Sequence, residues 1–130
     1  MSTPDDDARW RLLFQHNPQP MWIFDVETLR FLAVNDAAVA HYGWSVAEFA
    51  AMTIKDIRPA DEVAALLEDL AQGHTGLDGA RLWRHRKKDG QLIHVEITAH
   101  SVPFEGRAGR LVLAQDVTRR VLAEQALRSS

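Results

Sequence analysis

The sequence contains no cysteine, so it can form no disulfide, no thiolate nucleophile and no cysteine-ligated metal site. No apolar run approaches the roughly 20 residues that a membrane-spanning helix needs. The first ten residues, MSTPDDDARW, are acidic and include no apolar segment of the kind found in secretory signal peptides. We therefore expect a cytoplasmic location and no direct contact with a membrane, although a domain of a membrane-anchored protein would show the same pattern.

An excess of charge of one sign is also missing. The chain has 15 lysines and arginines against 18 acidic residues, which gives a formal net charge of −3. Nucleic-acid-binding domains carry a basic excess on one face, so nucleic acid is not an expected partner. The 130 residues are 46% hydrophobic and 25% charged, which is typical of one soluble globular domain.

Catalytic and metal-binding motifs are missing as well. The sequence has neither the G-x-S-x-G pattern of a nucleophile elbow nor the G-x-x-x-x-G-K pattern of a phosphate-binding loop. Six histidines are present, but no carboxylate or cysteine completes a metal-binding shell with His94 and His100, which are interpreted as surface residues. The acidic pair Glu68 and Asp69 is interpreted as solvated. We expect neither an enzyme nor a metal site.

The order of predicted elements indicates an antiparallel α+β domain. A helix is predicted over residues 5–16, two strands over 21–34, short helices over 36–72 and three strands over 79–117. Grouped strands and grouped helices are typical of this class. Asn35 is expected to cap a helix that Gly43 ends, and Ser45 with Glu48 forms a capping-box pattern.

The turn KDG at residues 88–90 permits two registers for the hairpin around it. A two-residue turn pairs His85 with His94 and places Arg84 on the apolar face. A three-residue loop with the glycine in a left-handed bulge pairs His85 with Ile93 and directs Arg84 outward. Burying unpaired arginines costs several kcal/mol, so we expect the second register.

The second register defines the interior face of the sheet. On the final strand, alternation offers either Leu111 with Leu113 or Val112 with Ala114, and the small side chain of Ala114 favours the latter pair. The predicted interior face then consists of Trp83, His85, Ile93, Val95, Ile97, Ala99, Val112 and Ala114.

Several segments in this order resemble the Per-Arnt-Sim (PAS) family of sensor domains with its C-terminal extension. They are IFD, LRFLAVNDAAVAHYGWSVAEF, IRPADE, RHRKKDGQLIHVEI and AQDVT, and the resemblance covers roughly residues 14–121. It implies an α+β fold in which five antiparallel strands and short helices enclose a small pocket. It also implies an N-terminal flanking helix over residues 1–17, a core over 18–118 and a signalling or coiled-coil linker helix over 119–130.

The resemblance further implies that the pocket holds a small molecule, whose identity the sequence does not give. No cofactor is evident: covalent flavin sensors and photoactive yellow proteins need a cysteine, non-covalent flavin has no positive signal, and residues 60–72 contain no histidine to bind haem. In the alternative interpretation, large side chains fill the pocket and the domain serves dimerisation or protein interaction. The expected pocket residues are Trp22, Phe24, Tyr42, Leu66, Leu70, Trp83, His85, Ile93, Val95, Ile97, Val112 and Ala114.

In the family that this chain resembles, the motif Asp116-Val117-Thr118 joins the sheet to an exit helix that drives an effector. Asp116 or Thr118 can cap that helix and so fix its first turn to the sheet. The exit helix carries an apolar stripe too short to be stable alone. It is expected to pair with a second copy or, in the alternative, to pack on its own domain as a frayed terminal helix, and the two are compatible. A histidine kinase or a diguanylate cyclase is the expected kind of effector.

The outer face of the sheet is predicted to be apolar at its centre and polar at its rim, which suggests a cover. We expect the N-terminal helix, from the same chain or from the second copy of a homodimer, to provide it with Trp10, Leu13 and Phe14. The outer face is expected to carry Leu82, Leu92 and Leu113 beside Arg84, His94 and Gln115.

Overall fold

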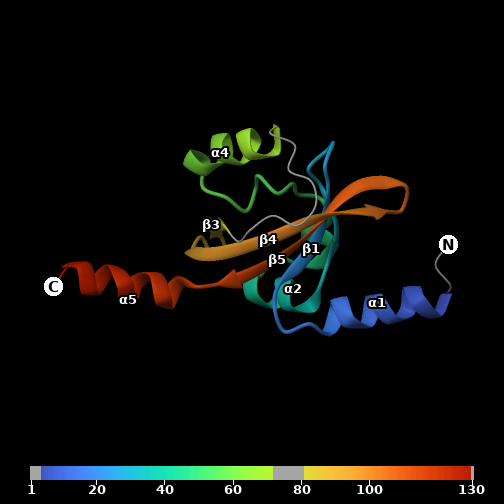
Figure 1. Cartoon of the computed structure of the whole chain (residues 1–130), viewed down its shortest axis with the longest axis horizontal. Helices are drawn as coiled ribbons and strands as arrows, with labels where there is room; N and C mark the ends of the chain where they lie inside the picture. Colours follow the sequence, from blue (N-terminus) through green and yellow to red (C-terminus); the bar gives the residue numbers. More distant parts are fainter. Residues whose placement is uncertain (1–3, 72–80, 130) are drawn as a thin grey trace.

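The computed structural model describes residues 4–71 and 81–129, and the side chains from residue 9 onward within those ranges. The predicted α+β fold is confirmed, with a five-stranded antiparallel sheet (Figure 1). From the sequence, Gly73 is expected to end the helix over residues 60–72, and this glycine lies outside the described residues. The elements in chain order are α1 (Pro4–His16), β1 (Met21–Asp25), β2 (Phe31–Val34), α2 (Asp36–Tyr42), α3 (Val46–Ala50), α4 (Ala60–Ala71), β3 (Arg81–Arg86), β4 (Leu92–Phe104), β5 (Arg107–Asp116) and α5 (Thr118–Ser129).

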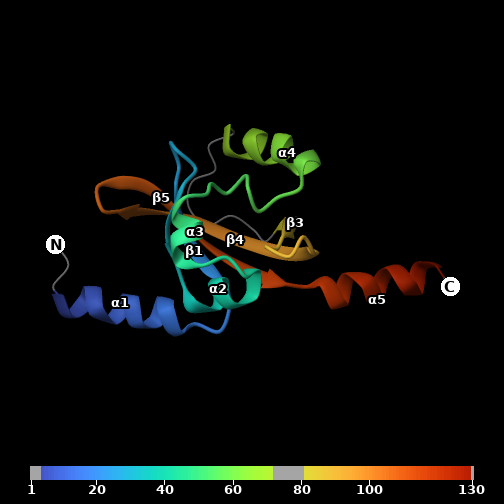
Figure 2. The ribbon, with the colours of Figure 1, turned by 180° about the vertical axis from the view of Figure 1, so that it is seen from behind.

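The strands are arranged in the order β2-β1-β5-β4-β3, so the last strand of the chain is the central one. It pairs with β1 on one side and with β4 on the other. In both overall views α4 and α1 lie on opposite sides of the sheet, and Figure 2 shows α2 and α3 in front of β1. The central strand therefore reaches from the middle of the core directly to α5.

The hairpin between β3 and β4 has the expected register. His85 pairs with Ile93 and Arg84 with His94, and Gly90 adopts a left-handed conformation with φ of +90°. The amide of Gly90 donates to the carbonyl of Lys87 at 2.9 Å and closes the loop. The prediction is confirmed, because this register buries every second residue of both strands and leaves Arg84 at the edge.

The predicted helix caps are also confirmed. The Asn35 side chain accepts a hydrogen bond from the amide of Ala38, and Gly43 ends α2 with φ of +89°. At the next helix, the Ser45 side chain accepts from the amide of Glu48, and the Glu48 carboxylate accepts from the amide of Ser45. These local bonds fix where the two short helices begin over the sheet.

The core is built around aromatic side chains on the inner face of the sheet. The Trp22 ring makes edge contacts with Phe31 and Tyr42, with ring centroids 5.8 and 5.6 Å apart. Phe31 continues the cluster to Phe49 of α3 at 4.9 Å. Edge contacts between aromatic rings add to the burial of their apolar area. Most of the interior beneath α2 and α3 is therefore densely filled.

Within one chain α1 covers only part of the outer face, and the expectation is wrong for Leu13 and for the leucines at the far side of the sheet. Phe14 is buried and Trp10 contacts the ring of Phe104 at 6.0 Å, yet Leu13 is 75% exposed. Leu82 and Leu92 also remain exposed. The helix precedes β1 by a short connection, whereas those leucines belong to β3 and the start of β4 at the far side of the sheet.

Helix α5 extends away from the body of the molecule in both views (Figures 1 and 2). It has no buried residue, and Leu122 is 54% exposed. The alternative in which this helix packs on its own domain is therefore wrong beyond its first turn. Pairing with a second copy remains a prediction.

Candidate functional site

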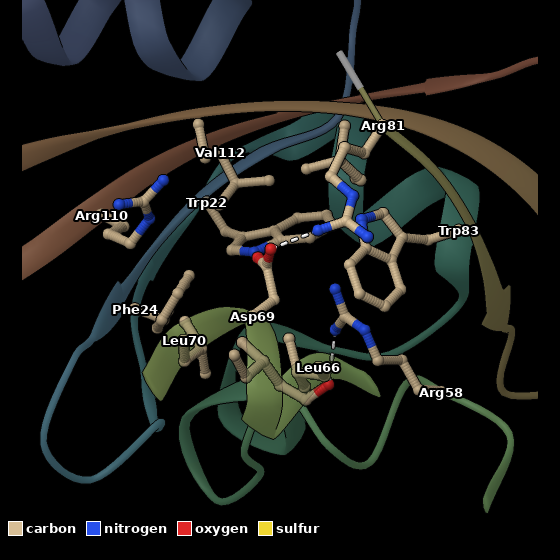
Figure 3. A pocket seen from close by; sticks show the side chains of 13 residues that line it. Trp22, Phe24, Arg58, Leu66, Asp69, Leu70, Arg81, Trp83, Arg110 and Val112 are labelled. Atoms are coloured by element: carbon tan, nitrogen blue, oxygen red, sulfur yellow. Dashed lines mark hydrogen bonds and ion pairs between the residues drawn. The ribbon is translucent and has the colours of Figure 1, made fainter. Parts of the chain in front are cut away.

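A small hollow opens between the inner face of the sheet and helix α4. Its volume is about 50 Å³. One water molecule needs roughly 10–15 Å³ on this measure, so the hollow has room for a few waters or a ligand of a few non-hydrogen atoms. Its lining, shown in Figure 3, consists of Trp22, Phe24, Ile54, Arg58, Leu66, Asp69, Leu70, Arg81, Trp83, Ile97, Ala99, Arg110 and Val112.

Arg58 is the most unusual residue of this lining because its guanidinium is buried in the core. Its Nη1 donates to the carbonyl of Ile54 at 2.8 Å, and the guanidinium lies 5.3 Å from the ring centre of Trp83. Its Nε has no hydrogen-bond partner among the described residues. Burial lowers the pKa of Arg58 to about 10, although the carboxylate of Glu62 acts in the opposite direction.

Two further arginines and one carboxylate complete the charged part of the lining. The guanidinium of Arg81 on β3 also lies over the indole ring of Trp83, 5.0 Å from the ring centre. Arg81 forms an ion pair with Asp69 of α4. Arg110 of β5 is buried. Figure 3 shows the three guanidinium groups arranged around the Asp69 carboxylate and Trp22. The hollow therefore combines aromatic walls with a ring of cationic groups.

Beside the hollow, Tyr42 and His85 form a buried hydrogen-bonded pair. The Tyr42 hydroxyl lies 2.6 Å from Nδ1 of His85, and both side chains are at most 1% exposed. Burial raises the pKa of Tyr42, which keeps its proton available for donation to Nδ1. Burial and, less strongly, the charge of Arg58 lower the pKa of His85 well below 6.5. The imidazole is therefore neutral at pH 7.

A second constellation lies where β5 passes into α5. The Asp116 carboxylate accepts a hydrogen bond from the Thr118 amide at 2.9 Å and lies 2.7 Å from Nε2 of His41 on α2. Partial burial acts to raise the pKa of Asp116, but the bonds from Thr118 and His41 outweigh it, so the pKa lies below its ordinary value. Asp116 thus joins the first turn of α5 to α2.

The same junction is fixed to strand β4. The amide of His94 donates to Oγ1 of Thr118 at 2.9 Å, and the amide of Val117 donates to the His94 carbonyl at 2.8 Å. Two residues after Thr118, Arg120 forms an ion pair with Glu96 at 2.8 Å. Asp116 acts as the expected cap, because its carboxylate accepts from the amide of Thr118, the first residue of α5. The Thr118 hydroxyl does not cap the helix, since it accepts a hydrogen bond from the amide of His94 on β4.

A family model described as the PAS fold matches residues 8–117. The chain belongs to the PAS family.

Relatives of this PAS domain occur in sensor proteins. The methyl sulfide methyltransferase-associated sensor of Methanosarcina acetivorans is 24% identical over 126 residues, which is 95% of this chain but 12% of that protein. A domain of a sensory box sensor histidine kinase/response regulator from Geobacter sulfurreducens is 25% identical and superposes with a TM-score of 0.72 over 85% of this chain and 93% of its own. The LOV protein of Rhodobacter sphaeroides is 12% identical, with a TM-score of 0.74 over 97% of this chain and 74% of its own.

The structure divides the twelve expected pocket residues of this PAS domain into two groups. Five of them, Tyr42, His85, Ile93, Val95 and Ala114, are buried in the densely packed part of the core and do not line the hollow. Whether the hollow holds a ligand remains a prediction. The seven residues that line it are Trp22, Phe24, Leu66, Leu70, Trp83, Ile97 and Val112.

The charged lining is what sequence reasoning missed. The interpretation of Asp69 as solvated is wrong, because its side chain is 21% exposed and paired with Arg81. The alternation of side chains along a strand could have predicted two of these residues. Arg81 lies two residues before Trp83 and Arg110 two residues before Val112, so each arginine lies on the same inward face as its apolar neighbour. Arg58 had no such signal, because it lies in an irregular segment before α4.

We predict a pH dependence of stability that originates in His85. Below about pH 6.5 the unfolded chain binds a proton at this imidazole while the folded chain does not, so stability falls by about 1.4 kcal/mol per pH unit until the folded pKa is reached. Unfolding by urea, measured between about pH 7.5 and 5, should show this slope in wild type and not in His85→Leu. Equal slopes in the two proteins would contradict the assignment.

Metal and membrane features are absent from the part of the chain that the structure describes. Within residues 4–71 and 81–129, no group of three or more histidine, aspartate or glutamate side chains is arranged to hold a metal ion. No described helix is both long enough and apolar enough to cross a bilayer.

Proposed function

We propose that this PAS domain is the sensing and relay module of a larger signalling protein, and that it is not an enzyme. A small molecule enters the hollow, and its occupancy is transmitted through Asp116-Val117-Thr118 to α5 and then to an effector. The sensor protein of Methanosarcina acetivorans and the sensor histidine kinase of Geobacter sulfurreducens support this class of role. A cytoplasmic location and a histidine kinase or cyclase as effector belong to the same proposal.

The observation that carries the proposal is the meeting of four elements at the exit junction. Asp116 contacts His41 of α2, and Thr118 of α5 contacts His94 of β4. His41 is followed on α2 by Tyr42, which holds His85 beside the hollow. A change in the packing of the sheet therefore acts on two residues of α2 that are adjacent in sequence, one facing the core and one facing the exit helix.

A second candidate function is relay without a ligand, in a homodimer formed through α1 and the outer face of the sheet. The dense aromatic cluster around Trp22 and the small volume of the hollow favour it. The exposed leucines of the outer face, Leu82 and Leu92, support a covering partner. In this case the domain passes on changes in its flanking helices and recognises no small molecule.

A ligand screen by thermal shift, with native mass spectrometry of the purified chain, discriminates between the two candidates. A ligand that binds only the folded state raises the melting temperature as its concentration rises. The sensing role predicts such a compound, together with a change in amide hydrogen exchange along residues 119–128. If the best binder leaves exchange in that segment unchanged, the proposed coupling is wrong. If a broad metabolite set gives no shift, relay alone is favoured.

A further inference from the structure

The polar lining of the hollow is mainly cationic. Among the described residues, three arginines and one aspartate line it. They come from separate elements: Arg58 from the segment before α4, Arg81 from β3, Arg110 from β5 and Asp69 from α4. Resting on the proposed function, we propose that the hollow binds a small oxyanion, such as a carboxylate or a phosphate, with Arg58 as the main donor and Asp69 as an internal competitor.

Arg58 supplies the first step of the argument. Its side chain is more than nine-tenths buried, and its Nε has no hydrogen-bond partner among the described residues. A guanidinium has five N–H donors, and a buried donor without a partner is costly. An oxyanion in the hollow next to Arg58 would accept from such donors and balance a charge that the core otherwise holds at an energetic cost.

The contacts of two arginines with the indole ring of Trp83 supply the second step. The guanidinium of Arg58 lies 5.3 Å and that of Arg81 lies 5.0 Å from the ring of Trp83. Stacking on an aromatic ring restricts the orientation of a planar guanidinium, so less freedom is lost when it binds a planar anion. Arginines held in this way are suited to two-point recognition of carboxylate or phosphate oxygens.

Asp69 supplies the third step, because it shows that this position accepts a carboxylate. Its side chain extends from α4 and pairs with Arg81 (Figure 3). An incoming anion would compete with Asp69 for the same cationic groups. Displacement of Asp69 would loosen α4 from β3, while contact with Arg110 would act on the central strand that ends at Asp116.

The volume of the hollow limits the size of the anion. About 50 Å³ admits a ligand of roughly three to six non-hydrogen atoms, unless Asp69 moves outward. Acetate, oxalate, nitrate and inorganic phosphate fall in this range. A nucleotide or a long-chain fatty acid does not.

The test is calorimetric titration of the 130-residue chain with sodium salts of acetate, oxalate, nitrate and phosphate, with ionic strength held constant by sodium chloride. We expect saturable binding of at least one of them. Arg58→Gln should weaken it about thirtyfold, because one partner of a buried charged contact is lost. Arg86→Gln is the matched control, since Arg86 is an exposed arginine at the end of β3 that does not line the hollow.

Asp69→Asn gives the sharper result, because a competing charge is removed and affinity should rise several-fold. This variant changes a partly exposed residue and keeps the charge of every arginine, so it also covers the case in which Arg58→Gln does not fold. Absence of saturable binding in both wild type and Asp69→Asn would overturn the proposal, as would weaker binding in Asp69→Asn. Comparison of carboxylates with phosphate and nitrate identifies the class of oxyanion.

Failure of this inference is distinguishable from failure of the proposed function. If a neutral compound binds and alters exchange in α5 while no anion binds, the oxyanion is wrong and the sensing role stands. If an anion binds with the expected effects of Arg58→Gln and Asp69→Asn but exchange in α5 is unchanged, the oxyanion site stands and the relay is wrong.

Discussion

Replacing Asn35 by alanine is expected to lower the free energy of unfolding by about 4 kcal/mol. Its Oδ1 accepts from the amides of Met21 and Ala38, both at 2.9 Å. Its Nδ2 donates to the carbonyls of Phe14 at 3.0 Å and Gln19 at 2.9 Å. The fully buried amide thus joins the end of α1, the start of β1 and the first turn of α2. Alanine leaves all four backbone groups without this partner.

Two control variants separate the causes of this loss in urea denaturation. Asn17→Ala removes one bond, to the amide of Gln19 at 2.8 Å, and should cost about 1 kcal/mol or less. Asn35→Asp keeps the acceptor but turns a carboxylate oxygen toward two carbonyls, so it should be nearly as destabilising as Asn35→Ala at pH 7. If Asn35→Ala costs no more than Asn17→Ala, the amide is only a local helix cap.

Asp116→Ala is expected to leave the core folded and to release α5 from it. The variant loses the bond to the Thr118 amide and the contact with His41, together about 2 kcal/mol, which corresponds to roughly thirtyfold faster exchange at the start of α5. An exposed helix of this length is unstable alone, so the junction supplies much of its order. Exchange in β4 and β5 should stay near that of wild type.

Gln115→Ala is the matched control for Asp116→Ala, since Gln115 is the exposed neighbour on the same strand. It should change exchange in α5 by less than about twofold. Loss of protection throughout the sheet of Asp116→Ala would make Asp116 a residue of general stability. Unchanged exchange in α5 would show that Asp116 does not hold the exit helix.

One physical rule explains both the success and the failure of sequence reasoning at the hairpin and the hollow. The rule that unpaired arginines stay out of the core selected the correct register of the β3–β4 hairpin. In that register Arg84 lies at the edge and forms an ion pair with Glu62. The same rule led us to overlook Arg58 and Arg110 as core residues, although both are buried. Their compensation comes from tertiary contacts, such as the Trp83 ring near Arg58, that a linear sequence does not specify.

Local bonds were predictable from the sequence, whereas long-range attachment was not. The caps at Asn35 and Ser45 follow from side chains that reach only three residues along the chain. The second half of the Asn35 network, to Phe14 and Gln19, depends on where α1 ends in space. For the same reason the sequence indicated an apolar face on α1 but not that Phe14 of this face would be buried while Leu13 stays exposed.

The most direct test of the coupling between hollow and exit helix needs no ligand. Ala99 lines the hollow and pairs with Val112 on the central strand, so Ala99→Val occupies part of the hollow with methyl groups. Hydrogen exchange of residues 119–128 is then compared in wild type, Ala99→Val, Asp116→Ala and the double variant. The account predicts that Ala99→Val alters exchange in α5 when Asp116 is present and has no further effect when Asp116 is alanine. An unaltered α5 in Ala99→Val, or an equal alteration in both backgrounds, would contradict it.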